Sequence, residues 1–237
     1  MATSSSIVPL LKSSLYDLYV VNSSGRSVET IVTRVTSTVD NWVNNVRSWN
    51  VVRLIGLDIE WRPNLNPGDN NPVATLQLCS GKTCLIFQVL RAQEIPVSLA
   101  ELLADPSFTF VGVGVGEDGE KLMKDHGLRV RNVVDLRYLG AVRLCREGFG
   151  RMGLKALAKA VLQWDMEKPK NVTLSRWDDD ALSDAQVQYA CIDALVSFEL
   201  GRAMSYWTTL EYCIGGVSCG YKIMYCMLPF AVSKVLN

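Results

Sequence analysis

An apolar segment that ends in two acids constrains the fold of this 237-residue chain more than any other feature. Residues 51–61 read VVRLIGLDIEW, with Asp58 and Glu60 two positions apart. Residues two apart in a strand share one face, so both carboxylates point the same way. Acids on a buried face need hydrogen bonds or a metal ion, because burying an uncompensated charge is costly. The segment therefore predicts a core strand with a polar site at its end.

Two further segments carry acids in a comparable context. Tyr189 and Asp193 are four apart in the helical stretch AQVQYACID, so they share one face of a helix. Asp118 follows FTFVGVGV, which is typical of a second strand. Each pattern alone is common, but four carboxylates and a phenol after buried elements indicate a divalent-metal site for phosphoryl transfer.

Composition narrows the chemistry. An apolar fraction of 49% is enough for a sizeable core in one domain with extensions. His126 is the only histidine, which excludes HExxH zinc sites. It precedes Gly127 at an expected helix end, so an exposed histidine is expected there and not a member of a Ser-His-Asp triad. The seven cysteines form no CxxC pair, which favours reduced thiols. Net charge is zero, yet residues 121–176 hold 13 Lys and Arg against 5 Asp and Glu, which fits a phosphate-binding face or an ordinary solvated surface.

Three regions follow from the patterning. Residues 1–14 are predicted to be a disordered N-terminus, since their first six positions are small and polar and the region has too few basic residues for a transit peptide. Residues 15–204 form the predicted domain. Residues 205–237 are an apolar extension of uncertain structure. Within it, 212–232 approaches the length of a membrane span, but glycines, Pro229 and Lys222 interrupt it. We therefore expect no stable membrane association.

Periodicity and turn signals predict the elements of the domain. Strands are expected at 15–21, 28–36, 51–60, 73–79, 84–89 and 108–113, with a further extended segment at 133–136. Helices are expected at 39–49, 96–103, 117–125, 138–145, 153–162 and 184–204, the last capped by Ser183. An N-terminal sheet followed by packed helices indicates an α/β or α+β domain.

Six short motifs, in this order, carry a family resemblance. They are GLDIEW (56–61), ATLQLC (74–79), VGVGVGED (111–118), GLKALA (153–158), KPK through SRW (168–177) and DAQVQYACIDA (184–194). The chain resembles the 3′–5′ exonuclease domains of the ribonuclease-H-like superfamily, in the branch with four acids and a tyrosine, and is most similar to plant Werner-syndrome-exonuclease-like proteins. The resemblance covers residues 50–203 and implies a mixed sheet of five to six strands flanked by helices.

The resemblance also implies roles for the five residues. Asp58 would bridge two metal ions, Mg²⁺ or Mn²⁺, with Glu60 and Asp193 on the ion that holds the attacking water. Asp118 would serve the second ion, directly or through water. Tyr189 would hydrogen-bond the attacking water. The reaction would be hydrolysis of phosphodiester bonds at 3′ ends of nucleic acids, releasing nucleoside monophosphates.

Four further residues are candidates for binding nucleic acid. Trp61 could stack on the terminal base or could pack at the end of its strand. Lys168, Lys170 and Arg176 could hold the phosphate backbone. Trp177 is expected in the core.

The sequence leaves several alternatives open. A catalytically weak nucleic-acid-binding or scaffolding module could share this fold, although the presence of all five residues argues against it. DNA or RNA could be the substrate, and the chain could form a homo-oligomer. An intracellular protein of the nucleus or cytoplasm is expected, with organelle targeting left open.

Overall fold

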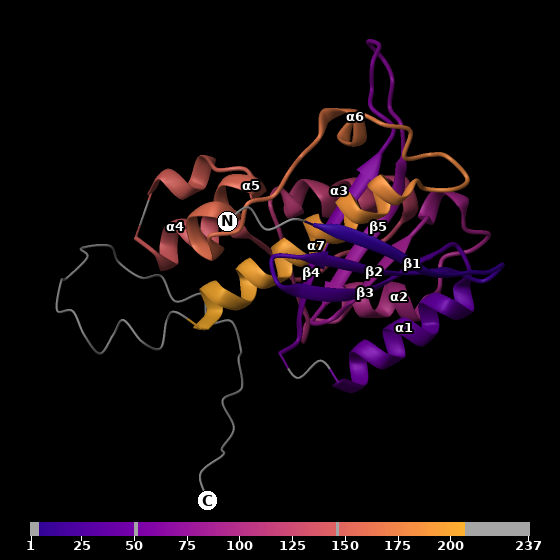
Figure 1. Cartoon of the computed structure of the whole chain (residues 1–237), viewed down its shortest axis with the longest axis horizontal. Coiled ribbons are helices and arrows are strands. Elements are labelled where there is room, and N and C mark those ends of the chain that lie inside the picture. Colours follow the sequence, from indigo (N-terminus) through magenta and orange to yellow (C-terminus); the bar gives the residue numbers. More distant parts are fainter. Residues whose placement is uncertain (1–4, 50–51, 146, 207–237) are drawn as a thin grey trace, which may run out of the picture.

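A mixed β-sheet with helices on both faces organises the chain (Figure 1). The computed structural model describes residues 5–49, 52–145 and 147–206. Within them the sheet has eight strands, ordered β1-β2-β3-β6-β5-β4-β7-β8. The pairs β3–β6, β4–β7 and β7–β8 are parallel, and the other neighbours are antiparallel. The strands are β1 (Ser6–Lys12), β2 (Asp17–Ser23), β3 (Arg26–Thr33), β4 (Leu54–Trp61), β5 (Val73–Ser80), β6 (Thr83–Phe87), β7 (Thr109–Gly112) and β8 (Val133–Asp135).

The helices divide between the two faces. One hydrophobic core joins the sheet to α1, α2 and α3, and a second joins the opposite face to α7 and the helices before it. The helical elements are α1 (Thr36–Trp49), η1 (Val89–Arg91), α2 (Val97–Ala104), α3 (Val115–His126), α4 (Leu136–Arg143), η2 (Glu147–Arg151), α5 (Leu154–Leu157), η3 (Ala158–Leu162), α6 (Lys170–Thr173) and α7 (Asp184–Tyr206). The predicted α/β fold is confirmed, with a sheet larger than the five to six strands expected.

The predicted disorder of the N-terminus was wrong for residues 6–12. Residues 6–12 of the segment predicted to be disordered form β1, which pairs antiparallel with β2 from Ser6 opposite Asn22 to Lys12 opposite Asp17. The prediction relied on the first six residues, which are small and polar. Residues 7–11 are largely apolar, and their composition suits a strand. The edge of β2 supplies the hydrogen-bonding partners that such a segment needs. The sheet therefore begins before residue 15.

The C-terminal extension lies almost entirely outside the described residues. Helix α7 ends at Tyr206, so only the first two residues of the extension belong to the described structure. Residues 212–232, weighed above as a membrane span, fall in the part that the structure does not describe. In the part it does describe, no helix has the length and hydropathy to cross a membrane.

The central strand β4 has two different faces. Ile55, Leu57 and Ile59 point into the core shared with α1 and α2. The alternate positions include Asp58 and Glu60, which point to the face covered by α7. The period-two alternation of a strand thus separates a wholly apolar layer from a layer that carries acids.

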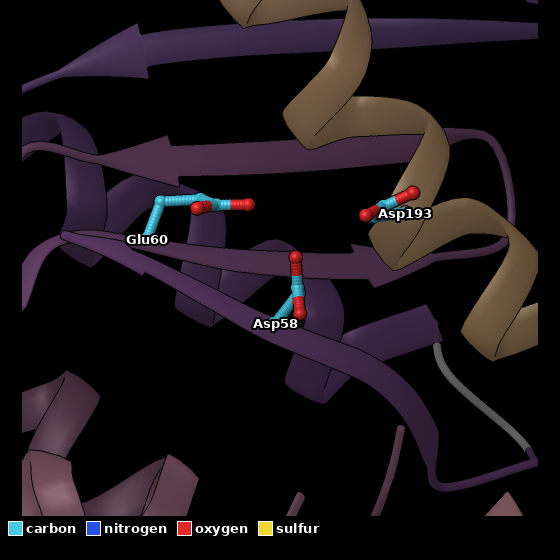
Figure 2. Close-up of side chains that lie close together, drawn as sticks. All are labelled: Asp58, Glu60 and Asp193. Atoms are coloured by element: carbon cyan, nitrogen blue, oxygen red, sulfur yellow. The ribbon is translucent and has the colours of Figure 1, made fainter. Parts of the chain in front are cut away.

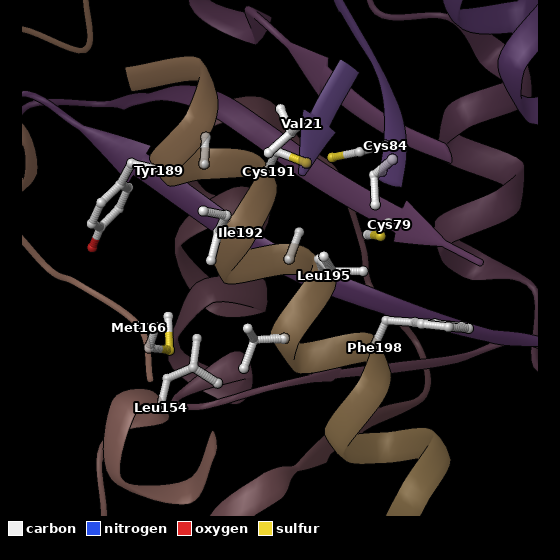
Figure 3. Packing of buried hydrophobic residues seen from close by; sticks show 14 of the residues in the cluster. Val21, Cys79, Cys84, Leu154, Met166, Tyr189, Cys191, Ile192, Leu195 and Phe198 are labelled. Atoms are coloured by element: carbon white, nitrogen blue, oxygen red, sulfur yellow. The ribbon is translucent and has the colours of Figure 1, made fainter. Parts of the chain in front are cut away.

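Helix α7 lies unusually close to β4. A Cβ atom at Gly56 would lie 2.0 Å from the carbonyl oxygen of Ala194 and 2.6 Å from the backbone nitrogen of Phe198. Gly201 on α7 likewise lies close to the sheet, since a Cβ there would lie 2.8 Å from the Val111 side chain on β7. Apolar side chains of α7 fill the remaining interface (Figure 3).

The start of α7 is defined by a capping box, as predicted at Ser183: the Gln186 N–H donates to Ser183 Oγ, and the Ser183 N–H donates to Gln186 Oε1.

Gly56→Ala should therefore destabilise the protein strongly. The added methyl group meets backbone atoms of α7, which cannot rotate away, so we expect a loss of about 3 kcal/mol in the free energy of unfolding. Urea denaturation measures this loss. Gly148→Ala is the matched control, because a Cβ at Gly148 meets nothing within 4 Å. Equal stability of the two variants would contradict the close packing of α7 on β4.

Candidate metal centre

Three carboxylates meet where α7 crosses β4. Asp58 and Glu60 extend from β4, and Asp193 extends from α7 toward them (Figure 2). One oxygen from each lies within 4.8 Å of the others. Asp193 is 3% exposed, while Asp58 and Glu60 are half-buried. Two residues 135 positions apart in sequence, Asp58 and Asp193, thus share one site, as the sequence predicts.

Burial raises the pKa values of all three acids, and neighbouring acids raise those of Asp58 and Glu60 further. Burial, followed by the negative charges of Asp193, Glu60 and Asp118, raises the pKa of Asp58 well above its usual range. Burial and then Asp193 raise the pKa of Glu60 to about 8. Burial also raises the pKa of Asp193, although Lys168 opposes that shift. Like charges held together in a poorly solvated site favour the protonated forms unless a cation is bound.

Asp118 lies beside this group rather than within it. It stands in the first turn of α3, after Gly114, whose left-handed backbone (φ 80°) begins the helix. The Gly114 N–H donates to Asp135 Oδ2 at 3.0 Å, which holds the turn in place. Burial, then Glu117 and Asp135, raise the pKa of Asp118 to about 7. Asp118 is close enough to raise the pKa values of Asp58 and Glu60 but is not one of the three clustered carboxylates.

Tyr189 lies one helical turn before Asp193 on α7. Its ring is 8% exposed, and its centroid lies 5.9 Å from that of Trp177, which is buried as predicted. Burial, followed by the charge of Asp193, raises the pKa of the phenol. The Tyr189 hydroxyl therefore keeps its proton at neutral pH and is available as a hydrogen-bond donor.

Lys168 is placed where sequence reasoning did not put it. Its ammonium group donates to Asp193 Oδ2 at 2.6 Å and to the Tyr189 hydroxyl at 3.4 Å. The sequence assigned Lys168 to the phosphate backbone, together with Lys170 and Arg176. No sequence signal pairs it with Asp193, 25 residues later, because the loop between η3 and α6 sets its position.

The other substrate-binding candidates are spread around the site. Trp61 directly follows Glu60 and is half-buried, with the Lys121 ammonium 5.1 Å from its ring centroid. Lys170 is exposed at the start of α6. Arg176 is exposed and forms an ion pair with Asp179 at 3.2 Å. Trp61 packs against the hydrophobic core at the end of β4 and keeps part of its side chain accessible.

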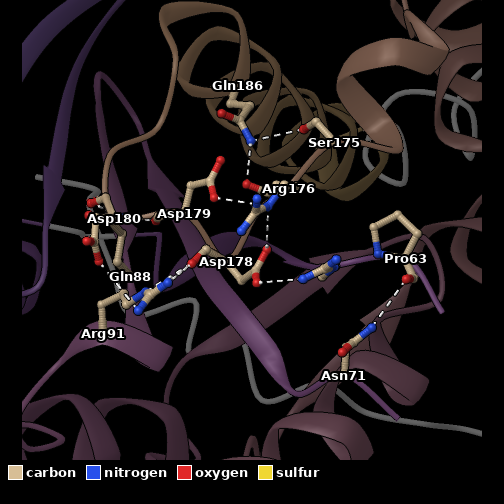
Figure 4. Close-up of polar contacts among 11 residues, drawn as sticks. Pro63, Asn71, Gln88, Arg91, Ser175, Arg176, Asp178, Asp179, Asp180 and Gln186 are labelled. Atoms are coloured by element: carbon tan, nitrogen blue, oxygen red, sulfur yellow. Dashed lines mark hydrogen bonds and ion pairs between the residues drawn. The ribbon is translucent and has the colours of Figure 1, made fainter. Parts of the chain in front are cut away.

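Arg176 belongs to an ionic network that anchors the chain before α7 (Figure 4). Arg62, Arg91 and Arg176 approach the consecutive acids Asp178, Asp179 and Asp180. The Gln186 side chain adds hydrogen bonds to Ser175 Oγ at 2.9 Å and to the Arg176 carbonyl oxygen at 3.2 Å. The network links the loop after β4 to the N-terminus of α7. It therefore connects the strand that carries Asp58 and Glu60 with the helix that carries Asp193.

The donor set fits a hard divalent cation. Asp58, Glu60 and Asp193 offer only carboxylate oxygens, which suit Mg²⁺ or Mn²⁺ better than Zn²⁺. Burial raises the pKa values of all three acids, so a bound cation would favour their charged forms. These three residues could hold a metal ion, and Asp118 is positioned to assist from α3.

Comparisons with known proteins identify the family of this chain. A model of the 3′-5′ exonuclease family matches residues 31–206. An Arabidopsis thaliana "3'-5' exonuclease" is 33% identical over 155 residues, which is 65% of this chain and 53% of that protein. The human "Exonuclease 3'-5' domain-containing protein 2" is 36% identical over 152 residues, or 62% of this chain and 24% of that protein. The chain thus spans about half the length of the first relative and a quarter of the second.

The chain is also similar to solved structures of the EXD2 exonuclease domain. A crystal structure of the EXD2 exonuclease domain soaked in Mn is 30% identical, and the match covers 81% of this chain and 100% of that chain, with a TM-score of 0.46. Another crystal of that domain was soaked in Mg and GMP. Because the family model covers most of its length, the chain belongs to the 3′-5′ exonuclease family, and its mixed sheet is the ribonuclease-H-like sheet of that family.

The crowded acids predict a pH-dependent stability in EDTA. The pKa of Glu60 is raised from 4.5 to about 8, so the native protein binds this proton more tightly than the unfolded chain does. The resulting stabilisation is present at about pH 4 and is lost as the pH rises through about 8. Urea denaturation measures the free energy of unfolding across this pH range. Between about pH 4 and about pH 8, this free energy should fall less for Glu60→Gln than for the wild type. Parallel curves for the two proteins would show that Glu60 does not titrate in this way.

Proposed function

We propose that this chain is a metal-dependent 3′–5′ exonuclease that hydrolyses phosphodiester bonds at nucleic-acid 3′ ends and releases nucleoside monophosphates. The observation that carries the proposal is the convergence of Asp58, Glu60 and Asp193 within 4.8 Å, with Tyr189 one helical turn from Asp193. Membership of the 3′-5′ exonuclease family supports the same reaction.

The proposed cofactor is a pair of Mg²⁺ or Mn²⁺ ions. When bound, two such ions lower the pKa of a water nucleophile and stabilise the leaving 3′ oxygen. The chain contributes the ligands: Asp58, Glu60 and Asp193 for the clustered position, and Asp118 for the second ion, directly or through water. The separation of Asp118 from the cluster supports a division between two ion positions.

Tyr189 orients the attacking water in this proposal. Its hydroxyl keeps its proton because its pKa is raised, so it donates a hydrogen bond and does not act as a general base. The packing of its ring near Trp177 limits movement of the side chain and so holds the hydroxyl oxygen in one position. An oriented donor lowers the entropy lost in reaching the transition state.

The proposed partner is the 3′ end of a nucleic acid. Trp61 stands next to Glu60 and presents part of its ring for stacking on a terminal base. Lys170 is an exposed cation on α6 that could contact phosphates, and Arg176 offers a second cation whose charge is shared with Asp179. Matched DNA and RNA substrates of one sequence decide which nucleic acid is degraded.

Asp193→Asn should abolish degradation of 3′-labelled DNA and RNA. The change removes a metal ligand and its charge, and EDTA should abolish the wild-type activity in the same assay. Asp165→Asn is the matched control, because Asp165 is an exposed acid paired with Lys159. A wild-type protein that binds nucleic acid without releasing nucleotides in Mg²⁺ or Mn²⁺ would favour the scaffolding alternative.

Tyr189→Phe should lower kcat while leaving substrate affinity nearly unchanged. The ring and its packing remain, but the hydrogen bond to the attacking water is lost. Such a bond contributes about 2–4 kcal/mol in the transition state, so kcat should fall roughly 30- to 1,000-fold. Single-turnover rates at saturating Mn²⁺ provide the measurement. A wild-type rate for the variant would leave Tyr189 as a core residue without a chemical role.

A further inference from the structure

The ammonium group of Lys168 occupies one side of the acid cluster. It lies 2.6 Å from Asp193 Oδ2 and 5.3 Å from the centroid of the Tyr189 ring. The Lys168 side chain is 32% exposed, whereas the Asp193 side chain is 4% exposed. The cation therefore enters the site from the solvent side and ends against its most buried carboxylate.

Lys168 supplies positive charge to the cluster of Asp58, Glu60 and Asp193 through its ion pair with Asp193. Among the described residues, no other Lys or Arg forms an ion pair with Asp58, Glu60 or Asp193. A divalent cation held by the same three carboxylates would lie close to this ammonium group. Two cations at that separation repel, and the repulsion is strong in a poorly solvated site. A metal ion and the ammonium group of Lys168 therefore compete for Asp193.

The chain around Lys168 allows its side chain to leave without moving the fold. Met166 is 5% exposed and Val172 is 7% exposed, so the segment is anchored on both sides of Lys168. Between these anchors, Lys168 lies outside any helix, just before Pro169, the N-cap residue of α6. The four-carbon stem of a lysine has enough rotamers to carry the ammonium group away while the backbone stays fixed.

We propose that Lys168 is a positioning residue that acts as an internal counter-cation. Its ammonium group neutralises the carboxylates in the metal-free protein, and a divalent ion displaces it from Asp193, so that Lys168 sets the affinity of the centre for metal. This role rests on the proposed metal-dependent function. It differs from the contact with the phosphate backbone expected from the sequence, because it requires no nucleic acid.

Lys168→Met tests the proposal through metal binding alone. The variant keeps a side chain of similar length but removes the competing charge, so Mn²⁺ should bind about tenfold more tightly than to the wild type. Isothermal titration calorimetry at constant pH, without substrate, gives the affinity. Lys170→Met is the matched control: Lys170 is exposed two residues away, and its removal should leave the affinity unchanged.

A second measurement uses the wild-type protein, so it does not depend on the folding of a variant. Limited acetylation followed by mass spectrometry should label Lys168 severalfold faster in Mn²⁺ than in EDTA, because the displaced ammonium group becomes accessible. Lys170 should be labelled equally in both conditions.

The outcomes separate this proposal from the proposed function. A wild-type protein that binds no Mn²⁺ would overturn both. A wild type that binds Mn²⁺ and degrades nucleic acid, with equal or weaker Mn²⁺ binding by Lys168→Met, would overturn the counter-cation role alone. Unchanged labelling of Lys168 on addition of Mn²⁺ would also overturn it, whatever the behaviour of the variant.

Discussion

The close approach of α7 to β4 at Gly56 is the interaction on which the rest of the structure depends. A glycine on the strand lets the backbone of Ala194 and Phe198 lie where any other side chain would stand. That contact sets the height of α7 above the sheet. It thereby places Asp193, one residue before Ala194, against Asp58, two residues after Gly56. A residue without a side chain thus determines the distance between the acids that do the proposed chemistry.

Gathering carboxylates in this way works against the stability of the fold. Burial raises the pKa values of Asp58, Glu60 and Asp193, and repulsion from neighbouring acids raises those of Asp58 and Glu60 further, a pattern that is common at functional sites. The surrounding structure offsets the cost by apolar packing along α7 and by the ammonium group of Lys168. Proteins commonly accept such local destabilisation where a function requires it.

The periphery keeps the two acid-bearing elements in register. The acids 178–180 receive arginines from the loop after β4, from η1 and from their own segment, and Gln186 joins that segment to the first turn of α7. Because these pairs are mostly exposed, each contributes little to stability. Their number and their position at the start of α7 matter more, since a shift of that helix would move Tyr189 and Asp193 together.

The sequence by itself determined most of the elements and the identity of the acids, because alternation in β4 and four-residue spacing in α7 are local properties of the chain. It also placed Ser183 at the start of α7, since capping depends on neighbours three residues away. It did not reveal β1, whose formation depends on the open edge of β2, or the final number of strands. Only the tertiary structure decided which carboxylates meet, that Asp118 stands apart from the other three, and that Lys168 points into the cluster. These outcomes depend on how closely α7 packs on β4, two segments more than a hundred residues apart in the sequence. They also depend on where the loop that carries Lys168 is anchored, 25 residues before Asp193.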